Sequence, residues 1–374
     1  MKKTDTRDIS NKPDKKKDHR CTIYDVARQA GVSAGTVSHV INRTATISED
    51  TRTRVLDAIS LLGYTRNENA RALRTSNSKI IGIVLQDIAS EYYAQCTAGI
   101  LQKAQEKGYA VLTLDAHFSP QVLRNGVEAL INRRVNGLIF VGGTRDRDVY
   151  EMASAAGVSV VFGDRHVPEY PCVQFNNYHT MYHLVRALYR QGYRKFFYYG
   201  EALSSQQNLE ERYGGFRDAL RDLKVPDDQC VAILQNDLDT GKMKKAFHYF
   251  QQWFRDETRF SHESVLLTSN DMIAQGVVSA ALRSGLRIPE DLAVFGFDNI
   301  SIAAYSVPSI STVAQDPYLL GEKCFEMLLR QMTGSHTREQ SDNLMLEQKV
   351  VLRETADLTP EYVLQEGLAL EETE

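Results

Sequence analysis

The sequence predicts an α/β protein in two unequal parts, a small all-helical head and a larger body of alternating strands and helices. Apolar residues recur at helical spacing in three short stretches between Thr22 and Tyr64, which indicates three helices. After Arg74 and the polar stretch TSNSK, near-continuous apolar segments alternate with helical ones, as in parallel β-α-β units. The chain has 374 residues, a length that accommodates two or three domains.

The head carries the start and stop signals of three short helices. Thr22 and Asp25 stand at the spacing of a capping box at the start of TIYDVARQA, and Ser33 can cap a second helix in TVSHVIN. Ser48 can cap a third helix, which Gly63 ends. These signals predict a compact helical domain with a small core.

The body contains eight segments that are typical of buried parallel strands. They cover residues 80–87, 109–116, 136–143, 158–164, 195–201, 231–237, 264–271 and 292–298. Many of these segments end in Asp, Asn or Gly, which places polar groups at the carboxyl ends, where open α/β sheets bind ligands. Two such sheets that face each other across a cleft would account for the length of the body.

Charge is distributed unevenly along the chain. Residues 1–79 hold 16 Lys and Arg against 9 Asp and Glu, whereas the remaining 295 residues hold 28 against 39. A basic head on an acidic body indicates a polyanionic partner for the head alone. Residues 1–20 have almost no apolar content, so we expect a disordered basic arm there.

The composition argues against a secreted or membrane-bound protein. The chain has five scattered cysteines, Cys21, Cys96, Cys172, Cys230 and Cys324. Because none of them forms a C-x-x-C pair, we expect reduced thiols and no metal site. The basic N-terminus lacks the apolar core of a secretory signal, and no apolar run reaches the roughly 18 residues of a membrane span. We therefore expect a cytoplasmic protein that needs no cofactor and no membrane.

The stretch GVSAG, residues 31–35, allows two interpretations. The pattern G-x-S-x-G presents a nucleophilic serine in some hydrolases, but that geometry needs a buried strand immediately before it. Here the preceding TIYDVARQA predicts a helix, no oxyanion-hole motif follows, and no histidine is tied to Ser33. We therefore interpret GVSAG as the turn and second helix of a helix-turn-helix, in which Gly31 permits a positive φ. The sequence predicts no enzyme.

The segment TIYDVARQAGVSAGTVSHVIN resembles the DNA-binding head of the lactose-repressor/galactose-repressor family of bacterial regulators. The likeness continues through ISEDTRTRVLDAISLLGYTRNENARALRTSNSKIIGIVLQDI to STVAQDPYLLGEKCFEMLLR and VVLRET, over about residues 21–355. It implies a helix-turn-helix domain over 21–65, a hinge helix and linker over 66–79, and a two-lobed, type I periplasmic-binding-protein-like effector domain over 80–360. The first lobe would take about 80–177 and 316–343 and the second about 178–315 and 344–360, which leaves 361–374 as an acidic tail.

The resemblance implies which residues of the head contact double-stranded DNA. The base readers would be Ala34, Gly35 and His39. The phosphate contacts would be Thr22, Tyr24, Ser33, Thr36, Ser38, Asn42, Ser48 and Thr51, although Thr22, Ser33 and Ser48 also serve as helix caps. Most relatives carry arginine in place of His39; an arginine can hold guanine with two hydrogen bonds, whereas a histidine makes one at most.

The segment NENARALRT, residues 67–75, resembles the hinge helix of the family. It is too short to be stable alone in water, so we expect it to fold only on DNA, beside its twin in a homodimer. Leu73 would wedge into a central base step from the minor groove, and Arg71 and Arg74 would lie beside phosphates. Relatives usually carry proline in place of Arg66, so this hinge is expected to be looser.

The resemblance also implies a set of effector contacts in the body: Asp87, Tyr92, Tyr93, Asp164, Arg212, Asn270, Asp298 and Gln315. Carboxylates, amides and a guanidinium that converge with aromatic rings suit a sugar or sugar derivative. Capping at strand ends is the alternative role for Asn270 and Asp298. Relatives commonly read S-N-P-F where this chain has Ala-Ser-Glu-Tyr at 89–92, so the resemblance does not carry a particular sugar with it.

Together these features imply a dimeric transcription factor, a repressor of sugar catabolic genes that binds a palindromic operator and is controlled by a small ligand. Either an inducer or a corepressor fits, since linkage allows both signs. One alternative is a regulator of the same family that a phosphocarrier protein controls. A more remote alternative is a sugar-binding receptor without a DNA function.

Overall fold

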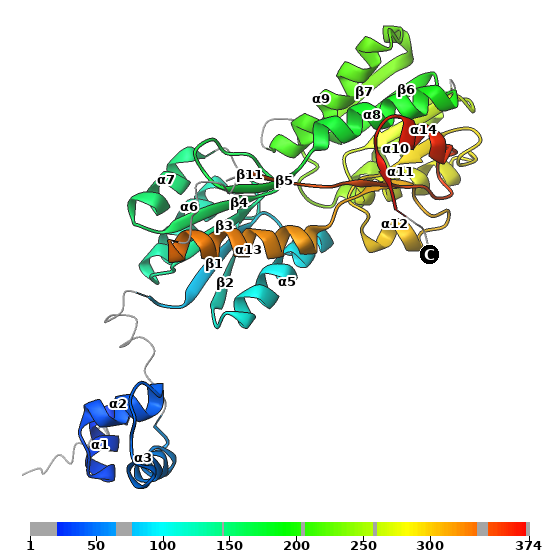
Figure 1. Ribbon diagram of the computed structural model, residues 1–374. Helices are drawn as coiled ribbons and strands as arrows, with labels where there is room; N and C mark the ends of the chain where they lie inside the picture. The colour runs from blue at the N-terminus through cyan, green and yellow to red at the C-terminus, as the bar shows by residue number, and fades with distance from the viewer. Residues whose placement is uncertain are drawn as a thin grey trace, which may run out of the picture. The chain divides into compact units, whose positions relative to one another are not determined.

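The computed structural model of the protein describes residues 21–64, 77–143, 146–202, 206–256, 260–334 and 343–371 (Figure 1). The chain divides into two compact units, Met1–Ser76 and Asn77–Glu374, which we treat separately. The expected basic arm at 1–20 and the expected hinge residues Arg71, Leu73 and Arg74 lie outside the described residues.

The first unit consists of the three expected helices, α1 (Ile23–Ala30), α2 (Ala34–Asn42) and α3 (Glu49–Leu62). Thr22 and Asp25 form the reciprocal capping box of α1, and Ser33 and Ser48 cap the other two helices. Gly31 ends α1 in the left-handed region, at φ +66°, which a glycine adopts without strain. The core of this unit is built on three fully buried valines, Val26, Val37 and Val55.

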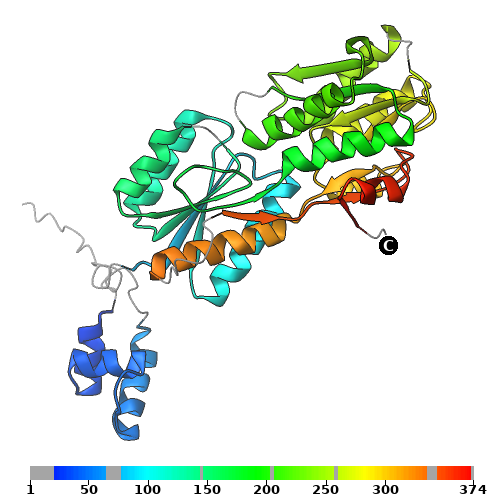
Figure 2. The same cartoon turned by 45° about the horizontal axis from the view of Figure 1, so that its top comes forward.

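The second unit has two lobes, and the first is a parallel sheet with the strand order β11-β5-β4-β3-β1-β2. Its strands are β1 (Ile80–Leu85), β2 (Ala110–Asp115), β3 (Gly137–Val141), β4 (Ser159–Gly163), β5 (Cys172–Phe175) and β11 (Asn343–Leu346). Helices α5 (Glu91–Glu106) and α13 (Pro317–Thr333) cover one face, and α6 (Pro120–Asn132) and α7 (Arg147–Ala155) cover the other (Figure 2).

The second lobe contains a parallel sheet in the order β7-β6-β8-β9 and a smaller sheet in the order β10-β12-β13. The strands are β6 (Lys195–Glu201), β7 (Cys230–Gln235), β8 (Ser264–Thr268), β9 (Ala293–Phe295), β10 (Thr312–Ala314), β12 (Lys349–Val351) and β13 (Ala369–Leu370). Helices α8 (Asn177–Gln191) and α9 (Gln207–Asp222) pack on one face of the larger sheet, and α10 (Lys242–Asp256) and α11 (Asp271–Arg283) on the other. Short helices complete the lobe: η1 (Asp227–Gln229), α12 (Ser301–Tyr305) and α14 (Pro360–Gln365).

All eight strands expected from apolar runs are present; β6 has the expected bounds, and the other seven are shorter than expected. The runs GLIFV of β3 and SVLLT of β8 are buried throughout, because helices cover both faces of each sheet. The sequence interpretation missed β5, β10, β11, β12 and β13. These strands have two to four residues, too few for a period-2 or buried-run signal.

The chain passes between the lobes three times, after β5, after β10 and after β11. The third passage was expected at 343/344, but β11 pairs with β5 of the first lobe, so it falls between Leu346 and Lys349. The expected acidic tail at 361–374 also needs correction. Residues through Leu370 belong to the second lobe, because β13 pairs with β12 and α14 packs on α8, with Val363 fully buried.

The described residues contain no helix that is both long and apolar enough to cross a membrane. They also contain no group of three or more His, Cys, Asp or Glu side chains arranged to hold a metal ion. No disulfide joins the cysteines.

Candidate functional site

Helix α2 presents two of the three expected base readers to solvent. Gly35 and His39 are exposed, while Val37 and Val40 turn into the core of the first unit. Ala34, in contrast, is half-buried and packs against that core. Ala34 therefore offers a smaller surface to a DNA base than the sequence suggested.

The imidazole of His39 is held by a neighbour beyond the end of α2. Its Nδ1 atom lies 2.9 Å from the Thr44 hydroxyl oxygen, so Nε2 is the ring nitrogen that this contact leaves available. The Asn42 amide instead donates to the Ser38 backbone carbonyl at 2.8 Å and to the Ser38 hydroxyl at 3.1 Å. This pairing fixes the end of the helix.

The residues expected to contact phosphate are mostly hydroxyls at helix starts. Ser33 accepts from the Thr36 backbone N–H at 3.0 Å, and Ser48 accepts from the Thr51 backbone N–H at 3.4 Å. In each case the two hydroxyls also lie within hydrogen-bond distance of each other. Thr22 caps α1, and Tyr24 is 70% exposed on that helix. The capping roles expected for Thr22, Ser33 and Ser48 are confirmed, and a helix N-terminus with exposed donors suits a phosphate.

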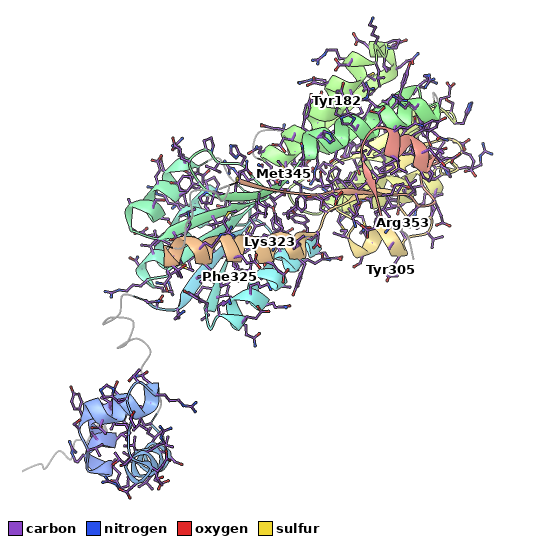
Figure 3. The ribbon with its side chains drawn as sticks, viewed as in Figure 1. Tyr182, Tyr305, Lys323, Phe325, Met345 and Arg353 are labelled. Carbon is purple, nitrogen blue, oxygen red and sulfur yellow. The ribbon has the colours of Figure 1, made fainter. Side chains whose placement is uncertain are left out.

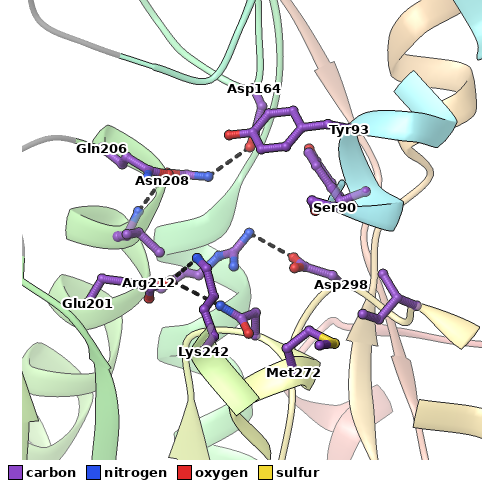
Figure 4. A pocket seen from close by; sticks show the side chains of 14 residues that line it. Ser90, Tyr93, Asp164, Glu201, Gln206, Asn208, Arg212, Lys242, Met272 and Asp298 are labelled. Atoms are coloured by element: carbon purple, nitrogen blue, oxygen red, sulfur yellow. Dashed lines mark hydrogen bonds and ion pairs between the residues drawn. The ribbon is translucent and has the colours of Figure 1, made fainter. Parts of the chain in front are cut away.

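A polar pocket lies between the lobes of the second unit (Figure 4). The first lobe contributes residues at the start of α5 and after β4, namely Ser90, Tyr92, Tyr93 and Asp164. The second lobe contributes Glu201, Gln206, Asn208, Leu209, Arg212, Lys242, Asn270, Met272, Asp298 and Ile300.

Six of the eight residues expected to contact an effector line this pocket: Tyr92, Tyr93, Asp164, Arg212, Asn270 and Asp298. Asp87 does not line it; its carboxylate accepts the Ala89 N–H at 3.0 Å and so holds the turn after β1. Gln315 also lies outside the lining, where its amide donates to Asp298 Oδ1 at 2.9 Å. Asn270 caps α11, which confirms the capping role considered for it, and it also lines the pocket.

An ion pair in the pocket was not foreseen from the sequence. The buried carboxylate of Glu201 pairs with Lys242 and accepts from the hydroxyl of Ser269 and, at 3.1 Å, from the amide of Asn270. Glu201 ends β6, so the rule that polar groups collect at carboxyl ends of strands could have found it. Lys242 opens a helix after a loop, and no sequence signal singled it out.

Arg212 connects the pocket with the passages between the lobes. Its guanidinium pairs with Asp298 at 3.2 Å and donates to the Ser269 carbonyl at 2.5 Å and to Asn177 Oδ1 at 3.0 Å. Asn177 starts α8 after the first passage, and its Oδ1 also accepts from the amide of Gln348, in the third passage, at 3.3 Å. A buried network thus runs from the pocket floor to two of the three crossing segments.

Burial shifts the protonation of the pocket carboxyls. Loss of solvent raises the pKa of Asp164 to about 7 against the opposing field of Arg212. Loss of solvent likewise raises the pKa of Asp298 to about 6, although Arg212 and Lys242 counter it. Burial works against the ionised form of Glu201 too, but the charge and hydrogen bond of Lys242 hold its pKa below the ordinary value.

Hydrogen bonds join the lobes on both sides of the pocket. Asn208 of the second lobe donates to Asp164 Oδ2 at 2.8 Å. On the other side, Glu91 Oε1 accepts from the Ser301 N–H at 3.0 Å and from the Ser301 hydroxyl at 2.6 Å. A ligand in the pocket therefore sits between groups that belong to two bodies.

A helix-turn-helix domain joined to a two-lobed domain with a polar pocket defines a DNA-binding regulator with a ligand site. Residues 22–67 match the family described as "Bacterial regulatory proteins, lacI family", and residues 185–356 match "Periplasmic binding protein-like domain". The chain thus combines a DNA-binding domain of the LacI type with a periplasmic-binding-protein-like domain, and over most of its length it is similar to DNA-binding transcriptional repressors.

Similar proteins extend over nearly the whole chain. The HTH-type transcriptional repressor PurR of Actinobacillus pleuropneumoniae serotype 3 is 28% identical over 89% of this chain and 97% of its own length. The regulator RegA of Clostridium saccharobutylicum is 27% identical over 89% of this chain and 98% of its own. Among solved structures, the Lac repressor dimer bound to operator and the anti-inducer ONPF has a TM-score of 0.77 at 26% identity, covering 90% of this chain and 99% of that one.

Proposed function

We propose that the protein is a homodimeric repressor of sugar catabolic genes whose affinity for a palindromic operator is controlled by a sugar or sugar derivative. The observation that carries the proposal is the pocket between the lobes. Its carboxylates, amides and guanidinium converge with two tyrosine rings, the donors, acceptors and flat faces that a polyol needs.

The reading helix in this proposal is α2. Gly35 lets the backbone approach the major groove closely, and His39 offers Nε2 to one base edge. Ala34 would add at most an apolar contact, such as one with a thymine methyl group. The contacts to phosphate would fix the register of the helix without reading sequence. At the hinge, the proposal has Leu73 wedge into a central base step from the minor groove, with Arg71 and Arg74 beside phosphates.

A homodimer would match the two-fold symmetry of a palindrome. Two large apolar side chains of the second lobe support this part of the proposal, because Tyr305 is 86% and Val307 is 87% exposed; Tyr305 is labelled in Figure 3. Exposed apolar residues of this size commonly mark a surface that a partner covers.

The proposal is tested by a gel shift of the full chain with palindromes from the neighbourhood of its own promoter, at low salt, with and without a panel of sugars and sugar phosphates. We expect one palindrome to shift and one class of small molecule to change its apparent Kd. His39→Ala should reduce the preference for that palindrome while leaving salt-sensitive binding to unrelated DNA intact. Absence of a shift with every palindrome would overturn the proposal.

A further inference from the structure

Asp164 is the acidic residue of the pocket that lacks a basic partner among the described residues. Its side chain is 4% exposed; Oδ2 accepts one hydrogen bond, from the Asn208 amide at 2.8 Å, and Oδ1 is buried without a hydrogen-bond partner. The hydroxyl of Tyr92, in the same lining, lies close enough to lower the pKa of Asp164. Buried polar atoms are rarely left without a hydrogen-bond partner. Because Oδ1 of Asp164 faces the pocket, a ligand can supply the missing donor.

The two basic side chains of the lining are already engaged elsewhere. Lys242 pairs with Glu201, and Arg212 pairs with Asp298 at 3.2 Å while donating to the Ser269 carbonyl. Three carboxylates therefore face two cations, and neither cation forms an ion pair with Asp164. A phosphorylated or carboxylated ligand would add negative charge to a buried site that already holds an excess.

We propose that the effector carries a protonated amine, which donates to Asp164, in addition to hydroxyls for the other polar groups, as in an amino sugar. The inference rests on the proposed function, since it takes this pocket as the effector site. An ammonium group gives the free Oδ1 a charge-assisted hydrogen bond and brings the lining to neutrality. Figure 4 shows the Tyr93 ring beside Asp164, and aromatic rings also favour a cation.

The surroundings of Asp164 support a cation over a neutral hydroxyl. The pKa of Asp164 is raised to about 7, chiefly by burial and also by Asp298 and Glu211, while Arg212 and the Tyr92 hydroxyl lower it. The ionised carboxylate of Asp164 is therefore destabilised in the empty pocket, because no nearby cation among the described residues pairs with it. A neutral sugar does not supply a positive charge to stabilise this carboxylate, whereas a bound ammonium group does.

The test uses the full chain and calorimetric titration with three matched sets of probes: glucosamine, galactosamine and mannosamine, the parent hexoses, and the corresponding hexose 6-phosphates. We expect at least one amine to bind about tenfold or more tightly than its parent, which is the difference that one charge-assisted hydrogen bond makes. Asp164→Asn should abolish that preference. Asp148→Asn, the same change at an exposed position of the first lobe, should preserve it.

Each other outcome overturns the inference. A parent hexose or a hexose phosphate that binds as tightly as the amine, or an amine preference that survives in Asp164→Asn, contradicts it. So does the absence of binding by every amine at millimolar concentration. Operator binding that responds to a neutral sugar would contradict this inference alone, whereas loss of operator binding in the wild-type chain would contradict the proposed function. Thermal unfolding of Asp164→Asn checks that the variant is folded.

Discussion

The DNA-binding head and the ligand pocket are built in opposite ways. In the head, the polar groups that position α2 come from the same short segment: Ser33 bonds to Thr36, and His39 to Thr44. In the pocket, the buried side chain of Arg212 contacts three residues that are far apart in the sequence. It donates hydrogen bonds to Asn177 and Ser269 and forms an ion pair with Asp298. The effects of substitutions in the head on stability should therefore be independent of one another, whereas substitutions in the pocket disturb a shared hydrogen-bond network.

The largest expected effect comes from removing the centre of that network. Arg212→Met removes the cation that pairs with Asp298 and one of the two donors to Asn177 Oδ1, so the free energy of unfolding should fall by about 3–5 kcal/mol. Urea unfolding of the full chain measures the change. Arg221→Met is the matched control on the same helix: Arg221 is 67% exposed and its ion pairs are solvated, so the change should stay within about 0.5 kcal/mol. Equal losses in the two variants would contradict the network.

The second effect concerns pH. The pKa of Asp164 is about 7 in the folded protein and the ordinary value is 3.8, so the folded state binds the extra proton between these values. The stability that this proton provides is complete below about pH 4 and is lost as the pH rises to about 7, a total change on the order of 4 kcal/mol. Asp164→Asn should flatten this part of the curve. Thermal unfolding of both proteins from pH 4 to pH 8 measures the difference, and identical profiles would contradict the shift.

A smaller effect is expected at the cap of the reading helix. Ser33→Ala removes the acceptor for the Thr36 N–H and should destabilise α2 by about 1 kcal/mol, seen as faster hydrogen exchange of the α2 amides. Ser33→Asp keeps an acceptor at the cap but adds negative charge. If Ser33 contacts phosphate, the aspartate variant should keep the slow exchange yet bind operator more weakly; operator binding at the wild-type level would limit Ser33 to capping.

The smallest effect is expected at the mouth of the pocket. Ser301→Ala removes the hydroxyl that donates to Glu91 across the lobes but leaves the backbone N–H contact. Because the pair is exposed, stability should change by less than about 1 kcal/mol. Ligand affinity, measured by calorimetry, should change by a small factor only. A loss as large as that of Arg212→Met would mean that the mouth, rather than the buried network, holds the lobes together.

The same contrast explains what the sequence could predict. Caps, the left-handed Gly31, apolar residues at helical spacing and near-continuous apolar runs are local signals, so the three helices of the head and eight strands of the body follow from them. The pocket residues Asp164, Asn270 and Asp298 could be found because strand ends collect polar groups at one edge. Lys242 and the amide of Gln348 act through contacts with distant segments, and no local pattern marks them. The sequence did not predict that residues 361–370 belong to the second lobe, because β13 has only two residues and is positioned by its pairing with the distant strand β12.

In the proposed function one chain couples operator binding to ligand binding, so each ligand should change the affinity for the other by the same factor. Fluorescence anisotropy with the shifted palindrome gives the factor by which a bound amino sugar changes operator Kd, and calorimetry gives the factor by which the operator changes amino-sugar Kd. Thermodynamic linkage predicts that the two factors are equal and differ from one, typically by about 5- to 150-fold. A ligand that binds with the same Kd in the presence and absence of saturating operator would contradict the account.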